Sequence, residues 1–182
     1  MNTIVKETLE DLEKTQKDFW NISRETANFL NMLIKMANCK HAVEVGTSNG
    51  YSGIWLGLAL KETGGHLTTI EYWEKRQSVA IENFEKCGVS DVITPVQGSA
   101  IDVLNELNKE IDFAFIDANK REYIDYFKII DKNLKSGGII AADNILSHAE
   151  KVKPFVDAIN EHPDYQVEIL NLPAGLLLAY KK

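Results

Sequence analysis

Apolar positions in the first forty residues recur every three to four places. Val5, Leu9 and Leu12 follow this spacing, and so do the apolar residues between positions 29 and 37. The spacing is typical of amphipathic helices. The stretch KDFWN at 17–21 between the two runs predicts a turn, so we expect helices that change direction before residue 41.

From residue 41 onward, short apolar runs alternate with helical patterns. We expect strands at 41–45, 66–71, 91–97, 111–117, 137–143, 165–170 and 175–181, and helices at 50–62, 74–86, 100–109, 121–134 and 150–161. This alternation predicts parallel β-α-β units with right-handed crossovers. The last two strands leave no room for a crossover helix and should form an antiparallel hairpin. The expected fold class is therefore α/β, a Rossmann-like doubly wound sheet of seven strands, mostly parallel, with an antiparallel C-terminal hairpin.

No repeat or Pro/Gly-rich linker divides the chain, so residues 1–182 should form one domain, with N-terminal helices in 1–40 and an α/β core in 41–182. No apolar run approaches the roughly 20 residues of a membrane span, and the N-terminus is too acidic for a secretory signal. Cys39 and Cys87 match neither a zinc nor a redox pair, which favours the reducing cytoplasm. The net charge of -7 disfavours nucleic acid as a partner and favours a small substrate.

The stretch VEVGTSNGYSG, at 43–53, places a glycine-rich turn after the first predicted strand. In doubly wound sheets, ligands lie beyond the carboxyl ends of the strands. Gly46 and Gly50 are separated by three residues, whereas dinucleotide-binding turns separate their first two glycines by one. The wider turn suits a ligand with a carboxylate and an amine. Glu44 would supply a counter-charge to an ammonium or sulfonium, unless it is a structural carboxylate that caps the next helix.

The end of the second predicted strand carries a second candidate pair. Glu71 is placed where an acid typically accepts hydrogen bonds from ribose hydroxyls. Tyr72 follows and could lie against a flat base. Ordinary packing is an equally open explanation for Tyr72 and for Trp73.

These motifs resemble those of the class I S-adenosylmethionine-dependent methyltransferases, and the reversed final hairpin is typical of that fold. FIDANK (115–120) and AADN (141–144) are similar to the cation-dependent O-methyltransferases typified by the catechol and caffeoyl-CoA enzymes. The resemblance covers roughly residues 23–182. It implies S-adenosylmethionine as cofactor, held by Glu44, Gly46, Ser48, Ser52, Glu71, Tyr72, Ser99, Ala100 and Asp117.

Asp117 ends the fourth predicted strand, and Asp143 and Asn144 end the fifth. Two carboxylates and an amide oxygen form a hard, all-oxygen set that suits Mg²⁺, Mn²⁺ or Ca²⁺ better than zinc. The family uses these positions as metal ligands, and Mg²⁺ is the ion we expect first. The alternative is that Asp143 and Asn144 only form a turn and that Asp117 caps the following helix.

Lys120 lies three residues after Asp117, so its amine can reach back toward the same rim. In the family, the lysine at this place is the general base toward the acceptor hydroxyl. A nearby divalent cation and a sulfonium would disfavour its ammonium form. The alternative is a solvated surface lysine.

The chain departs from its relatives in two places. Residues 27–29 read Ala-Asn-Phe where many relatives have Gly-Gln-Phe, and the segment after Asn144 lacks the usual acceptor-capping loop. His148 in that segment could reach an acceptor or could simply be solvated.

Together, the motifs predict a metal-assisted O-methyltransferase for a small, catechol-like acceptor with neighbouring oxygens, acting as the homodimer expected of the family. Three alternatives stay open: a methyltransferase for tRNA or another macromolecule, a cofactor-binding module without catalysis, and a nicotinamide dehydrogenase, which the glycine spacing disfavours.

Overall fold

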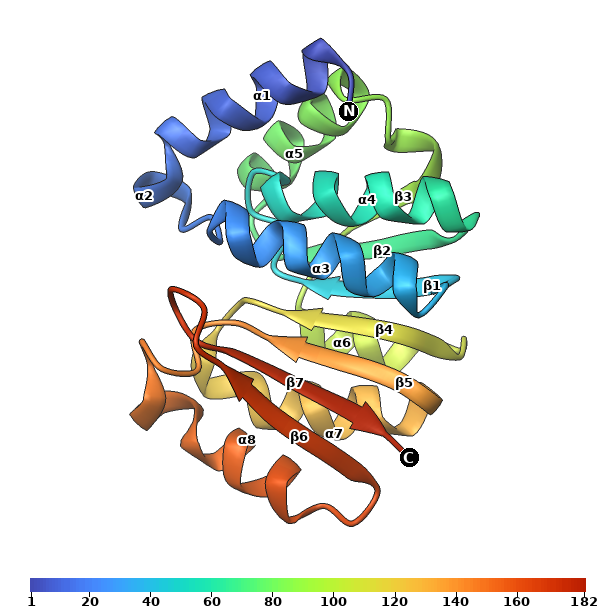
Figure 1. The fold of residues 1–182 in the computed structure, drawn as a ribbon, viewed down its shortest axis with the longest axis vertical. Coiled ribbons are helices and arrows are strands. Elements are labelled where there is room, and N and C mark those ends of the chain that lie inside the picture. The colour runs from blue at the N-terminus through green and yellow to red at the C-terminus, as the bar shows by residue number, and fades with distance from the viewer.

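Seven strands form one sheet in the order β3-β2-β1-β4-β5-β7-β6 in the computed structural model, which describes residues 1–182 (Figure 1). The strands are β1 (His41–Val45), β2 (His66–Glu71), β3 (Ile93–Gln97), β4 (Ile111–Ile116), β5 (Leu134–Ala142), β6 (Tyr165–Leu170) and β7 (Leu176–Lys181). Strands β1 to β5 pair in parallel, whereas β7 runs antiparallel to both β5 and β6. The predicted fold class is confirmed.

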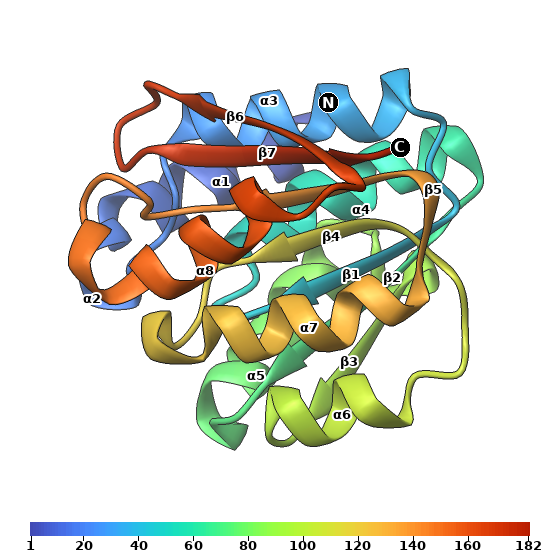
Figure 2. The same cartoon turned by 90° about the horizontal axis from the view of Figure 1, so that it is seen from below.

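Helices cover both faces of this sheet. They are α1 (Thr3–Lys14), α2 (Gln16–Phe19), α3 (Arg24–Met36), α4 (Tyr51–Thr63), α5 (Glu74–Lys86), α6 (Ala100–Glu106), α7 (Tyr123–Asn133) and α8 (Ala149–Glu161), with 3-10 turns at Ser90–Val92 and Lys120–Glu122. One apolar cluster joins the sheet to α1, α3, α4 and α5, and a second joins it to α6, α7 and α8. Figure 2 shows α3 and α4 on one side of the sheet and α6 and α7 on the other.

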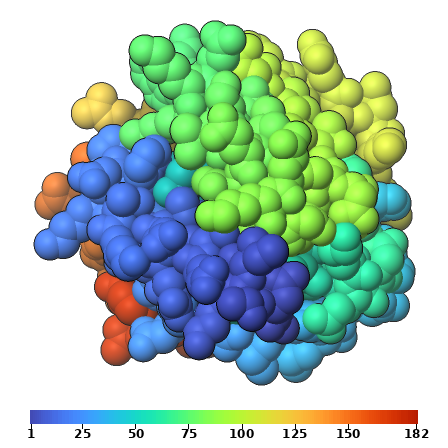
Figure 3. All heavy atoms as spheres, turned by 90° about the horizontal axis from the view of Figure 1, so that it is seen from above, coloured from blue at the N-terminus to red at the C-terminus, as the bar shows by residue number.

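The N-terminal helices change direction at the predicted turn, and side chains cap the starts of two of them. Asn2 accepts a hydrogen bond from the N–H of Val5 at the start of α1, and Ser23 accepts one from Thr26 at the start of α3. Such side-chain caps satisfy N–H groups that have no partner within the helix. Trp20 ends α2 with a positive φ of 57°, and the chain reverses there. Seen from above, α1 lies directly against α5 (Figure 3).

Three of the boundaries that differ from the predicted ones have a local cause. The sixth helix ends at Glu106 because Leu107 is extended, and Asn133 Nδ2 donates to its carbonyl oxygen at 3.0 Å. The third strand begins at Ile93 because residues 90–92 form a 3-10 turn. The fifth strand begins at Leu134, and a register shift against β4 accommodates the extra residues before Ile139.

None of the helices combines the length and the apolar character needed to cross a membrane.

The strand order reverses between β1 and β4, since β2 and β3 lie to one side of β1 while β4 and β5 lie to the other. In open α/β sheets the crevice at this point, beyond the carboxyl ends of the strands, is the usual ligand site. The candidate residues that follow β1, β4 and β5 therefore share one rim.

Candidate functional site

Backbone hydrogen bonds join the carboxyl ends of the three central strands. The N–H of Asp117 donates to the carbonyl of Val45 at 2.9 Å, and the N–H of Asp143 donates to that of Ile116 at 3.0 Å. The first residues after β1, β4 and β5 are consequently adjacent, as the sequence predicts.

Gly46 is required by the chain's own packing. Its φ is +104°, and a Cβ at this position would lie 2.1 Å from the carbonyl oxygen of Asp117. No other residue fits there without moving the backbone. The backbone of Asp117 thus packs closely against Gly46. This contact joins the turn after β1 to the end of β4.

Glu44 is completely buried at the end of β1, with an exposed fraction of 0%. Its Oε2 accepts the hydroxyl of Thr69 at 2.6 Å, and Thr69 in turn accepts the hydroxyl of Thr47 at 2.6 Å. Its Oε1 has no hydrogen-bond partner. Burial raises the pKa of Glu44 to about 7, although the hydroxyls of Ser52 and Thr69 oppose the rise.

The alternative that Glu44 caps the next helix does not hold, because the N–H of Tyr51 at the start of α4 donates to Asn49 Oδ1 at 3.2 Å and Glu44 accepts from Thr69 in β2. Buried polar atoms in folded proteins almost always have a partner. The free Oε1 therefore marks a place that a cationic or hydrogen-bonding ligand would complete.

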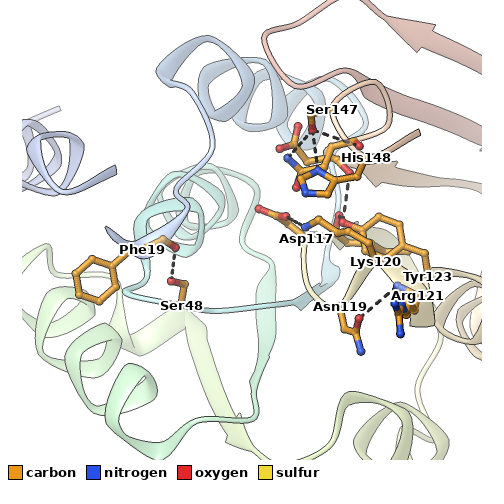
Figure 4. Close-up of polar contacts among 12 residues, drawn as sticks. Phe19, Ser48, Asp117, Asn119, Lys120, Arg121, Tyr123, Ser147 and His148 are labelled. Carbon is orange, nitrogen blue, oxygen red and sulfur yellow. Dashed lines mark hydrogen bonds and ion pairs between the residues drawn. The ribbon is translucent and has the colours of Figure 1, made fainter. Parts of the chain in front are cut away.

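Glu71 organises the turn around the other side of the rim. Its Oε2 accepts the backbone N–H of Ser48 at 2.8 Å, and its Oε1 accepts that of Trp73 at 2.9 Å. Each carboxylate oxygen keeps a further acceptor site. The hydroxyl of Ser48 donates to the carbonyl of Phe19 at 2.9 Å (Figure 4), so it ties the glycine turn to the end of α2.

Exposed aromatic side chains stand beside Glu71. Tyr72 and Trp73 are each 62% exposed and meet edge to face, with ring centroids 5.2 Å apart. Trp20 stacks with Arg76, whose guanidinium carbon is 4.7 Å from the ring centroid. Neither Tyr72 nor Trp73 is packed into the core, so both are accessible to a flat ligand.

Ser99 and Ala100 begin α6 next to these residues. Ser99 is the cap residue of that helix but its side chain makes no capping bond. The N–H of Gly98 donates to the carbonyl of Glu71 at 2.9 Å. This bond brings the start of α6 to the end of β2, where both predicted residues are half-buried.

Lys120 and two carboxyl groups form the second part of the rim. Lys120 Nζ donates to Asp117 Oδ1 at 2.7 Å. Asp143 is only 3% exposed, and its Oδ1 has no partner. Burial and then the negative charge of Asp117 raise the pKa of Asp143 to about 7. Burial also raises the pKa of Asp117, although the Lys120 ammonium opposes this rise.

The structure bears on three alternative roles of residues in this segment. Asn119, not Asp117, caps the 3-10 turn that follows β4, since its Oδ1 accepts the N–H of Arg121. Asn144 does form a turn, with a positive φ of 65°. Lys120 is not a solvated surface lysine, because only 16% of its side chain is exposed.

The segment after Asn144 forms a short hydrogen-bonded chain. Asn144 Nδ2 donates to Ser147 Oγ at 3.2 Å, and Ser147 Oγ is 3.0 Å from His148 Nδ1. Partial burial, followed by the positive charges of Lys120 and Lys151, lowers the pKa of His148. Figure 4 shows the imidazole of His148 next to the Asp117–Lys120 pair.

The predicted metal ligands are oxygen donors of the kind that a hard cation binds. No group of three His, Cys, Asp or Glu side chains is arranged to hold a metal. Asp117, Asp143 and Asn144 instead combine two carboxylates with an amide oxygen, and the unpartnered Oδ1 of Asp143 belongs to this set. Oxygen donors of this kind suit Mg²⁺, Mn²⁺ or Ca²⁺.

A hollow on the surface lies away from this rim. It has a volume of about 630 Å³ and is lined by residues of α1, α3 and α4, among them Glu13, Arg24 and Trp55. None of the predicted site residues lines it.

Comparison with known proteins decides the class of the chain. The O-methyltransferase family model matches residues 1–176. The chain belongs to the O-methyltransferase family. The enzyme class predicted from the sequence is thereby confirmed, and the dehydrogenase alternative is wrong.

Individual O-methyltransferases match most of this chain. Caffeoyl-CoA O-methyltransferase 1 of Arabidopsis thaliana is 34% identical over 93% of this chain and 75% of its own. The caffeoyl-CoA O-methyltransferase of Populus kitakamiensis is 36% identical over 85% of this chain and 70% of its own. The crystal structure of the Bacillus cereus O-methyltransferase in complex with SAH has a TM-score of 0.89 at 26% identity, and the match covers 100% of this chain and 92% of that one.

Sequence reasoning missed three residues of this O-methyltransferase that contact its site. Thr69 and Thr47 support Glu44, and Tyr123 lies beneath the ends of β4 and β5. The parallel register pairs Glu44 with Thr69, so a correct register for β1 and β2 would have identified Thr69. Tyr123 lies in the helix predicted at 121–134, where the spacing marks it only as an inward-facing position.

Proposed function

We propose that this chain is an S-adenosylmethionine-dependent O-methyltransferase, assisted by a divalent cation, that acts on a small acceptor with two neighbouring hydroxyl groups. One observation carries the proposal. Along a single rim, Glu44 Oε1 and Asp143 Oδ1 are buried carboxyl oxygens without partners, and Lys120 lies against the carboxylate between them. Such a rim is completed by two positive ligands.

The residues after β1 and β2 suit the methyl donor. Glu44 would face the positive charge of the donor, with Ser52 beside it, and the backbone N–H groups near Gly46 would face its carboxylate. Glu71 would accept the ribose hydroxyls through its remaining acceptor sites. Tyr72, Ser99 and Ala100 would border the adenine. The SAH in the Bacillus cereus relative is the demethylated form of this donor.

Asp117, Asp143 and Asn144 would hold the cation, with Mg²⁺ as the ion we expect first. When bound, such an ion supplies a positive charge that favours ionisation of an acceptor hydroxyl, an effect worth several kcal/mol. Three protein oxygens leave room in the shell of such an ion for two neighbouring acceptor oxygens. This is why we propose a catechol-like acceptor.

Lys120 is the proposed general base. Its Nζ lies 2.7 Å from Asp117 Oδ1, so the amine is held at the same rim as the proposed metal ligands. A cation bound at Asp117 would compete with Lys120 for that carboxylate. The methyl donor already carries a good leaving group, so positioning and charge would be the main contributions of the protein.

Methyl transfer from radiolabelled S-adenosylmethionine tests the proposal. We expect label in catechol or caffeoyl-CoA with Mg²⁺ present, loss of transfer after a chelator, and recovery when Mg²⁺ is added back. Transfer to bulk tRNA but not to catechols would favour a macromolecular acceptor. Cofactor binding without transfer to any acceptor would indicate a binding module, and chelator-insensitive transfer would remove the metal from the account.

We also propose a homodimer. Met32 and Met36 are 50% and 78% exposed and lie one turn apart on α3. Exposed apolar side chains gathered on one helix face often mark an interface. Light scattering on a size-exclusion column would give twice the 20.5 kDa chain mass if this is correct, and the single mass if it is not.

We further propose that residues 1–182 function as one domain and that the protein acts in the cytoplasm. Cys39 and Cys87 are both buried and unpaired, which fits a reducing compartment. Fractionation of cells that express the chain would test the location.

A further inference from the structure

Tyr123 joins the two strand ends that carry the acidic residues. It is the first residue of α7 and has an exposed fraction of 0%. Its hydroxyl lies 3.3 Å from the carbonyl oxygen of Ile116 and 3.3 Å from that of Asp143. Ile116 directly precedes Asp117, so a single hydroxyl bridges the backbone beside both carboxylates.

The Tyr123 hydroxyl, the Ile116 carbonyl and the backbone of Asp143 form one small hydrogen-bonded group. The carbonyl of Ile116 also accepts the N–H of Asp143 at 3.0 Å. The hydroxyl therefore adds a second link between two strand ends that are already joined by one ladder bond. With two links, the backbone positions from which Asp117 and Asp143 project are fixed relative to each other.

The ring of Tyr123 supports the third member of the group. Lys120 Nζ lies 5.4 Å from the ring centroid, within the range of a cation–π contact. The ring is itself held edge to face by Phe155, with centroids 5.8 Å apart. Figure 4 shows Tyr123 beside Lys120.

We propose that Tyr123 is a positioning residue that holds Asp117, Asp143 and Lys120 in the arrangement needed to bind the divalent cation. The inference rests on the proposed function. Its physical basis is that groups behind metal ligands fix the ligands' orientation, and their loss typically weakens metal binding about 10- to 100-fold.

Helix α7 offers a matched control. Tyr126 is a second buried tyrosine three residues later, but its hydroxyl donates to Glu122 Oε2 at 2.5 Å and makes no bond to a strand end. Tyr123→Phe and Tyr126→Phe thus remove the same group from the same helix. Only the first substitution removes the bridge between β4 and β5.

The experiment titrates Mn²⁺ alone into each purified full-length protein, followed by electron paramagnetic resonance of the free ion, with SAH binding measured separately by calorimetry. For Tyr123→Phe we expect the Kd of Mn²⁺ to rise at least about tenfold. The Kd of SAH should stay within about twofold of wild type, and kcat should fall without a matching rise in the KM for S-adenosylmethionine. Tyr126→Phe should leave all of these constants near their wild-type values.

Three results would overturn the inference. If both variants bind Mn²⁺ like wild type, Tyr123 does not position the ligands. If Tyr123→Phe weakens Mn²⁺ and SAH together and melts far below wild type, its role is general stability. If wild type itself binds no Mn²⁺, the metal-assisted function fails and this inference fails with it, an outcome distinct from the other two.

Discussion

At the scale of single residues, buried carboxyl groups make the stability of the fold depend on pH. The pKa of Glu44 rises from 4.5 to about 7 in the folded chain. Because the folded state then binds a proton that the unfolded state has released, stability falls as the pH rises from about 4.5 to about 7 and is constant above that. This shift corresponds to about 3 kcal/mol of folding free energy.

Glu44→Gln should therefore stabilise the ligand-free protein at pH 8 by about 2–3 kcal/mol, and the gain should shrink toward zero near pH 5. The amide oxygen can still accept the Thr69 hydroxyl. Urea denaturation at the two pH values measures the difference, and calorimetry at pH 8 should show weaker SAH binding. Equal stability of the two proteins at pH 8, with unchanged SAH affinity, would contradict the role given to Glu44.

Lys120→Arg should lower kcat by about 10²- to 10⁴-fold, the usual contribution of a general base. Arginine keeps the positive charge beside Asp117 but cannot lose its proton near neutral pH. Lys128→Arg, an exposed substitution on α7, is the control and should leave kcat unchanged. Steady-state kinetics with catechol checks both variants, and a wild-type rate for Lys120→Arg would exclude the lysine as base.

At the scale of elements, the end of the sheet opposite the site is held by Asp112 in β4. Its carboxylate accepts the N–H groups of Lys40 and His41 and pairs with Lys135 Nζ at 2.5 Å. Burial alone would raise the pKa of Asp112, but Lys135 and the two N–H groups outweigh burial and lower it. The ionised group therefore stabilises the fold at neutral pH, and this contribution is lost as the pH falls through its lowered pKa.

Asp112→Ala should lower the free energy of unfolding by about 2–4 kcal/mol, because it leaves two backbone N–H groups and a lysine without their acceptor. Asp91→Ala is the control, since Asp91 also pairs with a lysine, Lys61, but is exposed. We expect little measurable change there. Urea denaturation at pH 7 compares the two variants. Equal losses of the free energy of unfolding would show that Asp112 stabilises the fold no more than an exposed ion pair does.

Elements were predicted best from the sequence where the apolar periodicity and the residues at the boundaries agree. The strand at 41–45 and the helix at 74–86 match the structure at both ends, because apolar spacing and polar boundaries coincide there. The start of β5 was predicted poorly, because the apolar spacing also allows Leu134 to be the last apolar residue of α7. Only the register against β4 and the Lys135–Asp112 pair distinguish the two readings.

The rim residues were predictable for the same reason that the strands were. Gly46, Asp117 and Asp143 each follow an apolar run, and parallel strands bring their carboxyl ends together. The links between elements were not predictable. The Ser48 bond to Phe19 and the Tyr123 bond to Asp143 join residues 29 and 20 positions apart, and periodicity carries no information about such pairs.

At the scale of the whole molecule, the two halves of the sheet divide the proposed work. In the proposed function, residues at the ends of β1, β2 and β3 would face the methyl donor, whereas residues after β4 and β5 would face the cation and the acceptor. Gly46 lies where the halves meet, packed on the backbone of Asp117. The central claim is that a positively charged donor and a divalent ion occupy one crevice, side by side.

Anomalous diffraction from a crystal soaked with SAH and Mn²⁺ tests that claim most directly. The account expects a manganese peak among Asp117, Asp143 and Asn144, with SAH bound over the Gly46 turn in the same crevice. Bound SAH without a manganese peak at saturating concentration, or with Asp143 and Lys120 turned away from the crevice, would contradict it.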